Sequence, residues 1–102
     1  MSRSLVESLA RSIDVVTPDL IEVRRDLHSY PELSWQEERT TDVVAMWMDK
    51  AGISYERFEG TGLMAEIGPD EGPIVALRAD LDALPVVETS QDPWKSTIPG
   101  VS

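Results

Sequence analysis

The sequence predicts an α/β fold in which helices pack on a small mixed sheet. Apolar residues recur at helical spacing through about the first fifty residues, and the period changes to two from Ile53 onward. The run Ile74–Leu77 is apolar on both faces, as in a strand buried within a sheet. A chain of 102 residues has room for one small domain and not for two.

The first 16 residues are expected to form an amphipathic helix, because their apolar residues fall on one stripe. Thr17 followed by Pro18 is the pattern of an N-cap and a first-turn proline, so a second helix is expected to begin there. Pro31 ends this helix, since the residue before a proline is pushed out of the helical region. A helical hairpin and a single kinked helix both fit the pattern.

A further helix is predicted from about Trp35 to Ala51. Ser34 and Glu37 have the spacing of a capping box at its start, and Gly52 stands where a left-handed C-cap belongs. One face of this helix carries the residues expected in the core, Thr40, Val43, Val44, Trp47 and Met48.

Three strands are expected after this helix. The alternating residues between Ile53 and Ile67, interrupted by the turn 60–62, predict an antiparallel hairpin because the turn is too short for a crossover. A second turn at 68–73 leads into the predicted last strand, Ile74–Arg78. Beyond Asp82 the chain is expected to be irregular, because it is broken by Pro85, Pro93 and Pro99.

The acidic composition excludes some classes of partner. Nineteen acidic residues against nine basic ones give a net charge of −10, which repels nucleic acid and anionic membrane surfaces. The sequence has no cysteine, no run of about 18 apolar residues and no signal-peptide pattern at its start. We therefore expect a cytoplasmic protein without disulfides, nucleic-acid partners or membrane spans.

Two carboxylates, Asp80 and Asp82, follow the predicted last strand and form the candidate site. The carboxyl ends of strands are where ligands bind in open α/β sheets, and residues two apart on an extended chain point to the same side. Such a pair can orient a histidine ligand, hold a hard cation, or act as nucleophile and acid. The alternative is that the two aspartates cap the strand and pair with Arg78.

Five segments, in order, resemble landmarks of the M20 peptidase family of metal-dependent amidohydrolases. They read RRDLHSYPEL at 24–33, EERT at 37–40, GTG at 60–62, VALRADLDALP at 75–85 and STIPGV at 96–101. Together they cover about residue 21 to the C-terminus, which makes the resemblance more specific than any single motif. The branch it resembles contains N-acyl-amino-acid, hippurate and auxin-conjugate hydrolases.

The resemblance implies that residues 1–102 are an N-terminal fragment of the M20 catalytic domain, which has a three-layer, zinc-peptidase-like fold. It also implies that this fragment lacks the lid or dimerisation domain of the family. In such enzymes zinc or manganese activates a water that attacks the amide bond of an N-acyl amino acid. The ligands of this branch come from an HACGHD segment, a Glu-Glu pair and further histidines that are not in this chain. No metal is therefore expected to bind the isolated chain, and we expect it to be inactive.

The resemblance also assigns roles to the two aspartates. Asp82 matches an aspartate that orients a metal-ligand histidine, whereas Asp80 stands where other branches carry the ligand histidine itself. His28, the single histidine, is expected to be a hydrogen-bonded structural residue. Glu32, Glu37 and Glu38 are expected to be helix-capping and solvated charges, and Trp35, Trp47 and Met48 are expected in the core. Trp94, in the irregular stretch close to the expected site, is a candidate for a substrate-facing role.

Two other functions are compatible with the sequence. A strand ending in Asp-x-Asp also resembles magnesium phosphatases that use the first aspartate as nucleophile and the second as acid. The chain also fits a small acidic interaction module without catalysis. Because the run Ile74–Leu77 is apolar on both faces, an unpartnered edge there predicts self-association that increases with salt.

Overall fold

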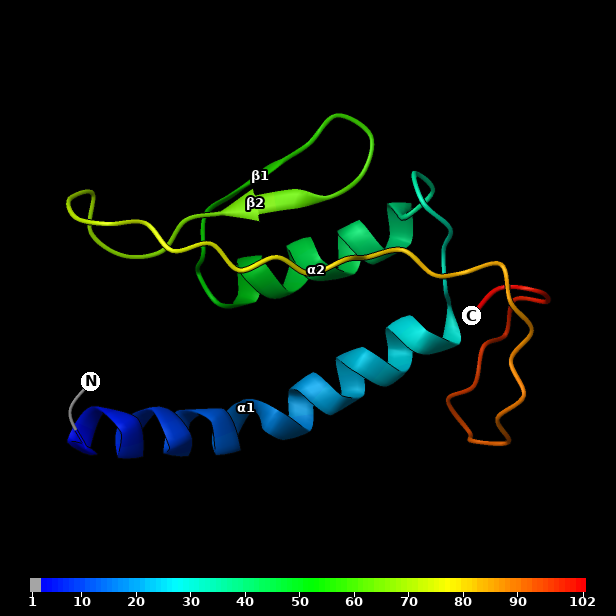
Figure 1. Cartoon of the computed structure of the whole chain (residues 1–102), viewed down its shortest axis with the longest axis horizontal. Helices are drawn as coiled ribbons and strands as arrows, with labels where there is room; N and C mark the ends of the chain where they lie inside the picture. The colour runs from blue at the N-terminus through cyan, green and yellow to red at the C-terminus, as the bar shows by residue number, and fades with distance from the viewer. Residues whose placement is uncertain (1–2) are drawn as a thin grey trace.

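The computed structural model of the protein describes residues 3–102. Two helices are followed by a short hairpin: α1 (Arg3–Ser29), α2 (Glu38–Lys50), β1 (Tyr55–Arg57) and β2 (Leu63–Ala65). The hairpin lies along α2, α1 runs on the other side of α2, and the chain after β2 is largely extended (Figure 1). The predicted α/β class is confirmed.

The N-terminal residues form one continuous helix with Pro18 inside it, so the prediction of a second helix capped by Thr17 is wrong. Thr17 donates its hydroxyl hydrogen to the carbonyl of Ile13 at 2.6 Å, back along the helix, instead of capping a new one. Pro18 has no amide hydrogen to continue the ladder, and the axis of α1 changes direction about midway (Figure 1). The kinked-helix alternative holds, and the helix ends two residues before Pro31.

Much of the apolar surface is left uncovered. The chain exposes 8406 Å², whereas a compact protein of 11.3 kDa exposes about 5,700 Å². Within residues 3–102 the buried hydrophobic residue is Ala45, joined by the buried threonines 40, 41 and 61, and no residue of α1 is buried. Neither of the two helices described is long and apolar enough to cross a membrane.

Glu32 caps the start of α2. Its Oε2 accepts a hydrogen bond from the Arg39 amide at 3.1 Å, and its Oε1 accepts from both the amide and the hydroxyl of Thr40 at 2.6 Å. The predicted helix-capping role of Glu32 is confirmed, because two of the free amides in the first turn of α2 are satisfied by its carboxylate.

The capping box predicted at Ser34 and Glu37 is wrong. Helix α2 begins at Glu38, and the Glu37 side chain makes no capping hydrogen bond. Trp35 takes a left-handed backbone conformation with φ of 67° and is 81% exposed, so its predicted place in the core is also wrong. The amides of Arg39 and Thr40 in the first turn are instead satisfied by the carboxylate of Glu32.

Arg39 joins the end of α1 to the start of α2. Its Nη2 donates to both carboxylate oxygens of Asp26, at 2.9 and 3.0 Å, and its guanidinium lies over the Tyr30 ring at 4.3 Å. A bidentate contact of this kind fixes orientation as well as distance. The two helices are therefore held together by polar contacts next to the turn, rather than by an apolar seam.

Helix α2 ends in a Schellman motif at the predicted position. The Ile53 amide donates to the Met48 carbonyl at 2.9 Å and the Gly52 amide donates to the Asp49 carbonyl at 3.1 Å. Gly52 has a φ of 69°, which a residue without Cβ adopts at little cost. The C-cap predicted at Gly52 is confirmed.

The antiparallel hairpin predicted between residues 53 and 67 is confirmed. Strands β1 and β2 pair in the register Tyr55 with Ala65, Glu56 with Met64 and Arg57 with Leu63. The turn between them contains Gly60 and Gly62, both at positive φ, as the predicted 60–62 turn requires.

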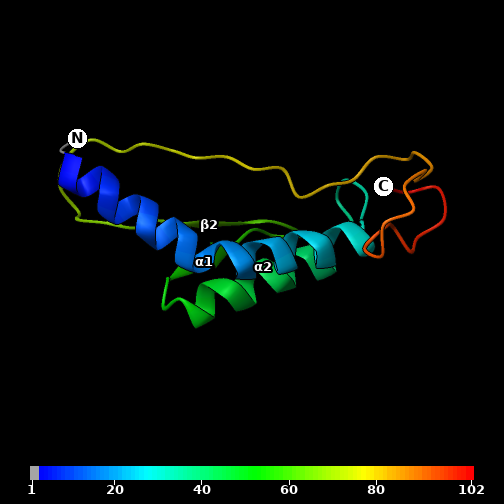
Figure 2. The same ribbon diagram turned by 90° about the horizontal axis from the view of Figure 1, so that it is seen from below.

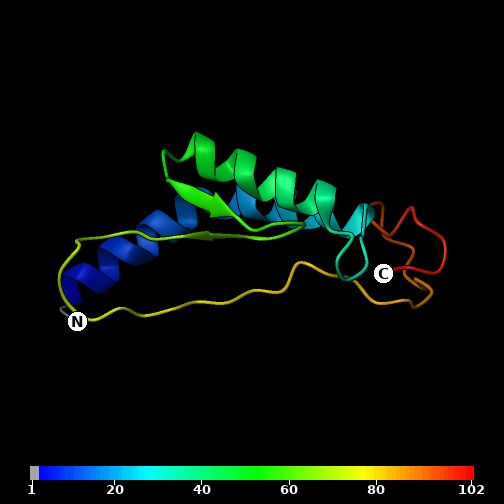
Figure 3. The same ribbon diagram turned by 90° about the horizontal axis from the view of Figure 1, so that it is seen from above.

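The third strand predicted at Ile74–Arg78 is wrong. Residues 74–82 are extended but form no ladder with any other part of residues 3–102, and Ile74, Val75 and Leu77 are 85 to 101% exposed. Figures 2 and 3 show this segment running along one side of the molecule with no strand beside it. A strand needs a hydrogen-bonded neighbour, and the described residues do not supply one.

The irregular chain predicted after Asp82 is confirmed, and it is fastened to the end of α1. Ala83 forms an isolated parallel bridge with Leu33, and its amide donates to the Glu32 carbonyl at 2.7 Å. The Thr97 amide and hydroxyl both donate to the carbonyl of Ser29, at 2.9 and 2.7 Å.

Replacing Glu32 tests the cap. Burial alone raises the pKa of Glu32, but hydrogen bonds from the side chain and amide of Thr40 and from the Arg39 amide outweigh it, so the pKa lies below its ordinary value of 4.5. A lowered folded-state pKa contributes stability above about pH 4.5 that is lost as the pH falls through the folded-state value. We expect Glu32→Gln to lower the free energy of unfolding by about 1 to 2 kcal/mol at pH 7 and by less near pH 3.

Urea denaturation followed by circular dichroism at the two pH values measures this difference. Glu38→Gln is the matched control, because it removes a carboxylate from the same helix turn without removing a side-chain cap. Equal effects of the two substitutions at pH 7 would show that only charge at the helix terminus matters, and not the hydrogen bonds of Glu32.

Candidate functional site

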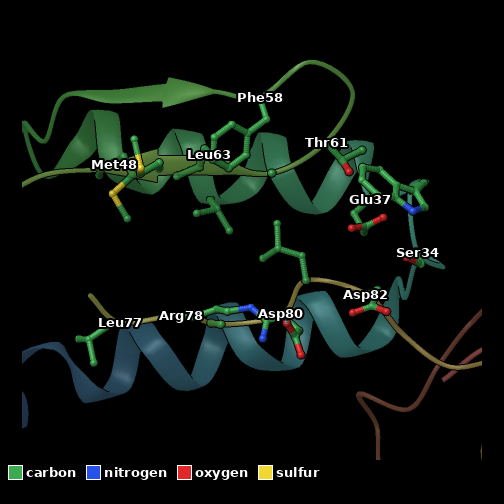
Figure 4. Close-up of a pocket in the computed structure, with 17 residues that line it drawn as sticks. Ser34, Glu37, Met48, Phe58, Thr61, Leu63, Leu77, Arg78, Asp80 and Asp82 are labelled. Carbon is green, nitrogen blue, oxygen red and sulfur yellow. Dashed lines mark ion pairs between the residues drawn. The ribbon is translucent and has the colours of Figure 1, made fainter. Parts of the chain in front are cut away.

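An open groove of about 810 Å³ lies between the α2 and hairpin layer and the extended segment. Its walls come from four parts of the chain, which Figure 4 shows facing one another across the opening. The lining includes Glu37 and Ser34 before α2, Val44 and Met48 on α2, Thr61, Leu63 and Met64 on the hairpin, and residues 77–82 opposite them. The predicted core residue Met48 is thus half-buried at the edge of a groove.

Thr41 fixes the hairpin to α2. Its hydroxyl donates to the Glu37 carbonyl at 2.6 Å and accepts from the Gly62 amide at 2.9 Å, and the residue is 1% exposed. An ion pair of 2.7 Å between Arg57 and Asp42 adds a second, more exposed connection. The sequence signal for Thr41 was weak, since a threonine in a helix reads first as a neutral helix residue.

Glu37 lies at one end of the groove. Its Oε1 is buried and has no hydrogen-bond partner among residues 3–102. Figure 4 shows its carboxylate on the side of the groove where Thr61 and Asp82 also lie. The sequence suggested only a capping or solvated charge here, because burial of a single carboxylate oxygen depends on the tertiary contacts.

Asp80 and Asp82 both line the groove, so the structure brings the two predicted site residues to the same wall. Asp80 pairs with Arg78 at 2.8 Å, which is the salt bridge that the alternative interpretation predicted. Asp82 is exposed, and no residue of 3–102 donates a hydrogen bond to its carboxylate. The aspartates lie on an exposed extended chain, rather than at the end of a buried strand.

The residues described do not fit a metal centre. Within residues 3–102 no group of three or more histidine, cysteine, aspartate and glutamate side chains is close enough to hold an ion. His28 is hydrogen-bonded to Glu88, at 3.2 Å between Nε2 and Oε1, as its predicted structural role requires.

The contact of His28 belongs to the C-terminal loop and not to the groove. The hydrogen bond that Ser102 donates, and then the contact with His28, hold the pKa of Glu88 below its ordinary value of 4.5. Trp94 is in the same region, where its ring lies under the Arg25 guanidinium at 3.8 Å. Trp94 does not line the groove.

Known proteins are similar to this chain in sequence and in fold. No protein-family model matches the chain. The N-acyl-L-amino acid amidohydrolase of Geobacillus stearothermophilus is 42% identical over 97 residues, which are 93% of this chain and 26% of that protein. A crystal structure from Bacillus subtilis, described as a dinuclear metal binding peptidase from the M20 family, matches with a TM-score of 0.80 and 41% identity, over 86% of this chain and 25% of that one.

The chain belongs to the M20 family. The resemblance seen in its motifs is thereby confirmed for sequence and fold together. The Geobacillus relative is named as an amidohydrolase of N-acyl-L-amino acids, and the Bacillus structure is described as a peptidase that binds two metal ions. This M20 chain spans about a quarter of the length of each of them.

Another protein that matches the chain carries a different name. A protein of Rhodococcus jostii named glutamate–cysteine ligase 2-3 is 52% identical over 84 residues, which are 81% of this chain and 11% of that protein. Most of that protein lies outside the match. The ligase name therefore gives no activity to the M20 chain.

Replacing Thr41 tests the contact that holds the hairpin against α2. Thr41→Val keeps the side-chain shape but leaves the Gly62 amide without its acceptor, so we expect a loss of about 1 to 3 kcal/mol in the free energy of unfolding. Amide hydrogen exchange at Gly62 should become at least about tenfold faster.

Thr61→Val is the matched control, because Thr61 is also buried but its hydroxyl makes no hydrogen bond with residues 3–102. Its exchange rate at Gly62 and its unfolding midpoint should stay near those of the parent chain. An equal loss in both variants would mean that the removed hydroxyl, and not the bond to Gly62, causes the effect.

Proposed function

We propose that residues 1–102 form the N-terminal portion of the catalytic domain of an M20 amidohydrolase that cleaves the amide bond of N-acyl amino acids or similar conjugates. The observation that supports this most is the 42% identity to a named N-acyl-L-amino acid amidohydrolase across 93% of the chain. Because the chain spans about a quarter of that relative, the activity is proposed for an assembled enzyme and not for these residues alone. The substrate is therefore a small molecule.

Asp82 is the residue to which we assign the principal role at this site. Its carboxylate is exposed at the groove and has no partner among residues 3–102, so it is available to accept a hydrogen bond from a histidine outside this chain. Such a bond fixes the tautomer and the orientation of the histidine ring. Asp80 has a secondary role, since its carboxylate already pairs with Arg78.

The metal of the assembled enzyme is proposed to be zinc or manganese, which suit a site of imidazole and carboxylate ligands. The ligands themselves are assigned to residues beyond this chain, because the described side chains form no ligand set. Location in the cytoplasm stays a prediction from the sequence.

We also propose that the chain associates with itself through residues 74–82. Three apolar side chains of this segment, Ile74, Val75 and Leu77, are almost fully exposed. An extended apolar segment without a hydrogen-bonded neighbour is a template for pairing with another chain.

A chimera tests the proposed enzyme function. The 97 matched residues of the Geobacillus amidohydrolase are replaced by this chain, and hydrolysis of N-acetyl amino acids is measured with zinc or manganese present. We expect the chimera to be active. We further expect Asp82→Asn in the chimera to lower kcat/KM by about 10- to 100-fold, and Asp80→Asn to change it by less than about threefold.

Metal content and circular dichroism of each chimera separate folding from catalysis. A folded, metal-loaded chimera without hydrolysis of any N-acyl amino acid would contradict the proposed activity. If both asparagine variants stayed within about threefold of the parent chimera, the assignment of Asp82 would be wrong, and pairing with Arg78 or capping would account for the two aspartates.

The 102-residue chain by itself should not hydrolyse N-acyl amino acids and should not bind zinc tightly. Activation of water requires a metal, and tight binding requires three or four correctly placed ligands. Isothermal titration with zinc and an amide hydrolysis assay on the purified chain measure both properties. Metal-dependent turnover that disappears in the Asp82→Asn variant of the same preparation would overturn this expectation.

A further inference from the structure

The short connection 32–37 between the two helices is tied to both walls of the groove. At one end, the carbonyl of Glu32 accepts a hydrogen bond from the Ala83 amide at 2.7 Å. At the other end, the carbonyl of Glu37 accepts from the amide and the hydroxyl of Thr41, at 3.0 and 2.6 Å. The connection is therefore fixed relative to α2 and relative to the chain that enters the opposite wall.

These links bring Glu37 and Asp82 to the same end of the groove. Asp82 directly precedes Ala83, which is bonded to the connection, and both carboxylates line the groove. Figure 4 shows them on the same side of the opening, one from each wall. Their relative position follows from short hydrogen-bonded links, and does not depend on the exposed run 74–77.

The carboxylate of Glu37 lacks a hydrogen-bond donor. Its Oε1 is buried and has no partner among residues 3–102, and the side chain does not cap α2. None of the ion pairs within these residues includes Glu37. A carboxylate oxygen that is removed from water without a donor costs free energy, and a partly desolvated carboxylate binds a donor more strongly than an exposed one. The side chain is thus suited to accept from a group outside these residues.

We propose that Glu37 is a positioning residue for the Asp82 site of the assembled enzyme. Its carboxylate accepts a hydrogen bond from a backbone N–H of the segment whose histidine is held by Asp82. The two carboxylates then fix that segment from two sides. This proposal rests on the amidohydrolase function proposed above and adds a second residue to its site.

The chemistry of imidazole and of the backbone assigns the donor. A neutral imidazole has one N–H, which is used in the bond to Asp82, so the ring has none left for Glu37. The backbone amides beside the histidine lose water when the domain is complete, and each then needs an acceptor. A carboxylate already fixed at that end of the groove supplies one.

Substitution of Glu37 in the Geobacillus chimera tests this role. Glu37→Leu removes the acceptor and should lower kcat about tenfold while KM stays within about twofold, because the contact acts on the geometry of the reacting groups and not on substrate binding. Glu37→Gln keeps an acceptor oxygen and should return kcat to within about threefold of the parent chimera.

Glu38→Leu is the matched control, since Glu38 is the exposed neighbour at the start of the same helix, and its kcat should stay within about twofold of the parent. A glutamine variant as slow as the leucine variant would overturn the amide donor, because charge would then be required. A loss confined to KM would place Glu37 in substrate binding and would also overturn the proposal.

A double-mutant cycle shows whether Glu37 acts through the Asp82 site. Once Asp82→Asn has released the histidine, loss of the second contact should matter little. We therefore expect the double variant Glu37→Leu with Asp82→Asn to have a kcat/KM within about threefold of that of Asp82→Asn alone. If the two effects multiply instead, Glu37 acts independently of Asp82 and is not a positioning residue for it.

Stability measurements separate this role from a merely structural one. In the 102-residue chain the buried oxygen has no donor, so Glu37→Leu should lower the urea midpoint no more than Glu38→Leu does. In the folded chimera, where the hydrogen bond is made, Glu37→Leu should lower the midpoint more than Glu38→Leu. A larger loss for Glu37→Leu in the 102-residue chain would show that Glu37 supports this fold alone.

These outcomes are separate from those of the amidohydrolase proposal. An active chimera whose kcat is unchanged by Glu37→Leu would remove the role of Glu37 and leave the enzyme proposal intact. A folded, inactive chimera would contradict the enzyme proposal, and the comparison of urea midpoints would still decide whether Glu37 gains a hydrogen bond from the added residues.

Discussion

The carboxylate of Glu32 is the contact on which most of the arrangement depends. It satisfies amides at the first turn of α2 and so fixes where that helix starts. Arg39, on the same turn, holds Asp26 of α1 with two hydrogen bonds. With no buried residue on α1 to provide an apolar seam, these polar contacts set the relation of the two helices. Hydrogen bonds to charged groups are strong enough and directional enough for that task.

The position of α2 determines the position of one wall of the groove. Thr41 of α2 accepts a hydrogen bond from the Gly62 amide and so fixes the hairpin to α2. The groove wall formed by α2 and the hairpin therefore depends on the Glu32 cap at the start of α2. Within residues 3–102, the opposite wall, residues 77–82, is anchored next to Asp82, where Ala83 pairs with Leu33 and donates to the Glu32 carbonyl. Asp82 lies next to that anchor, whereas Leu77 lies several residues from it. The anchored end of the segment is thus better suited to a defined chemical role, and the other end to association.

The large uncovered surface bears both on the proposed amidohydrolase function and on the proposed self-association. A radius of gyration of 16.3 Å exceeds the value of about 12.8 Å typical of a compact chain of this length. The relatives are about four times as long as the matched region, and additional residues of such length can cover an apolar segment like 74–77. In the chain described here the same segment is open, which is the basis of the proposed self-association.

The sequence by itself determined the local structure. Gly52 and the glycines of the 60–62 turn predicted the end of α2 and the hairpin, because positive φ is a property of single residues and needs no distant partner. The family was also evident from ordered motifs, including the segment that carries Asp80 and Asp82. His28 was correctly assigned a hydrogen-bonded structural role, but its partner Glu88 is brought to it by the tertiary structure.

Only the tertiary structure decided the rest. The capping box at Ser34 failed because α2 begins later than predicted, at Glu38, where the carboxylate of Glu32 accepts from the amides of Arg39 and Thr40. The strand at 74–78 failed because strand formation requires a neighbour at hydrogen-bonding distance, which an apolar pattern cannot guarantee. Pro18 stayed inside a helix for a related reason: a local signal for a helix start was overruled by the helical residues on both sides. Burial of one oxygen of Glu37 likewise depends on the packing of distant segments, which no residue pattern records.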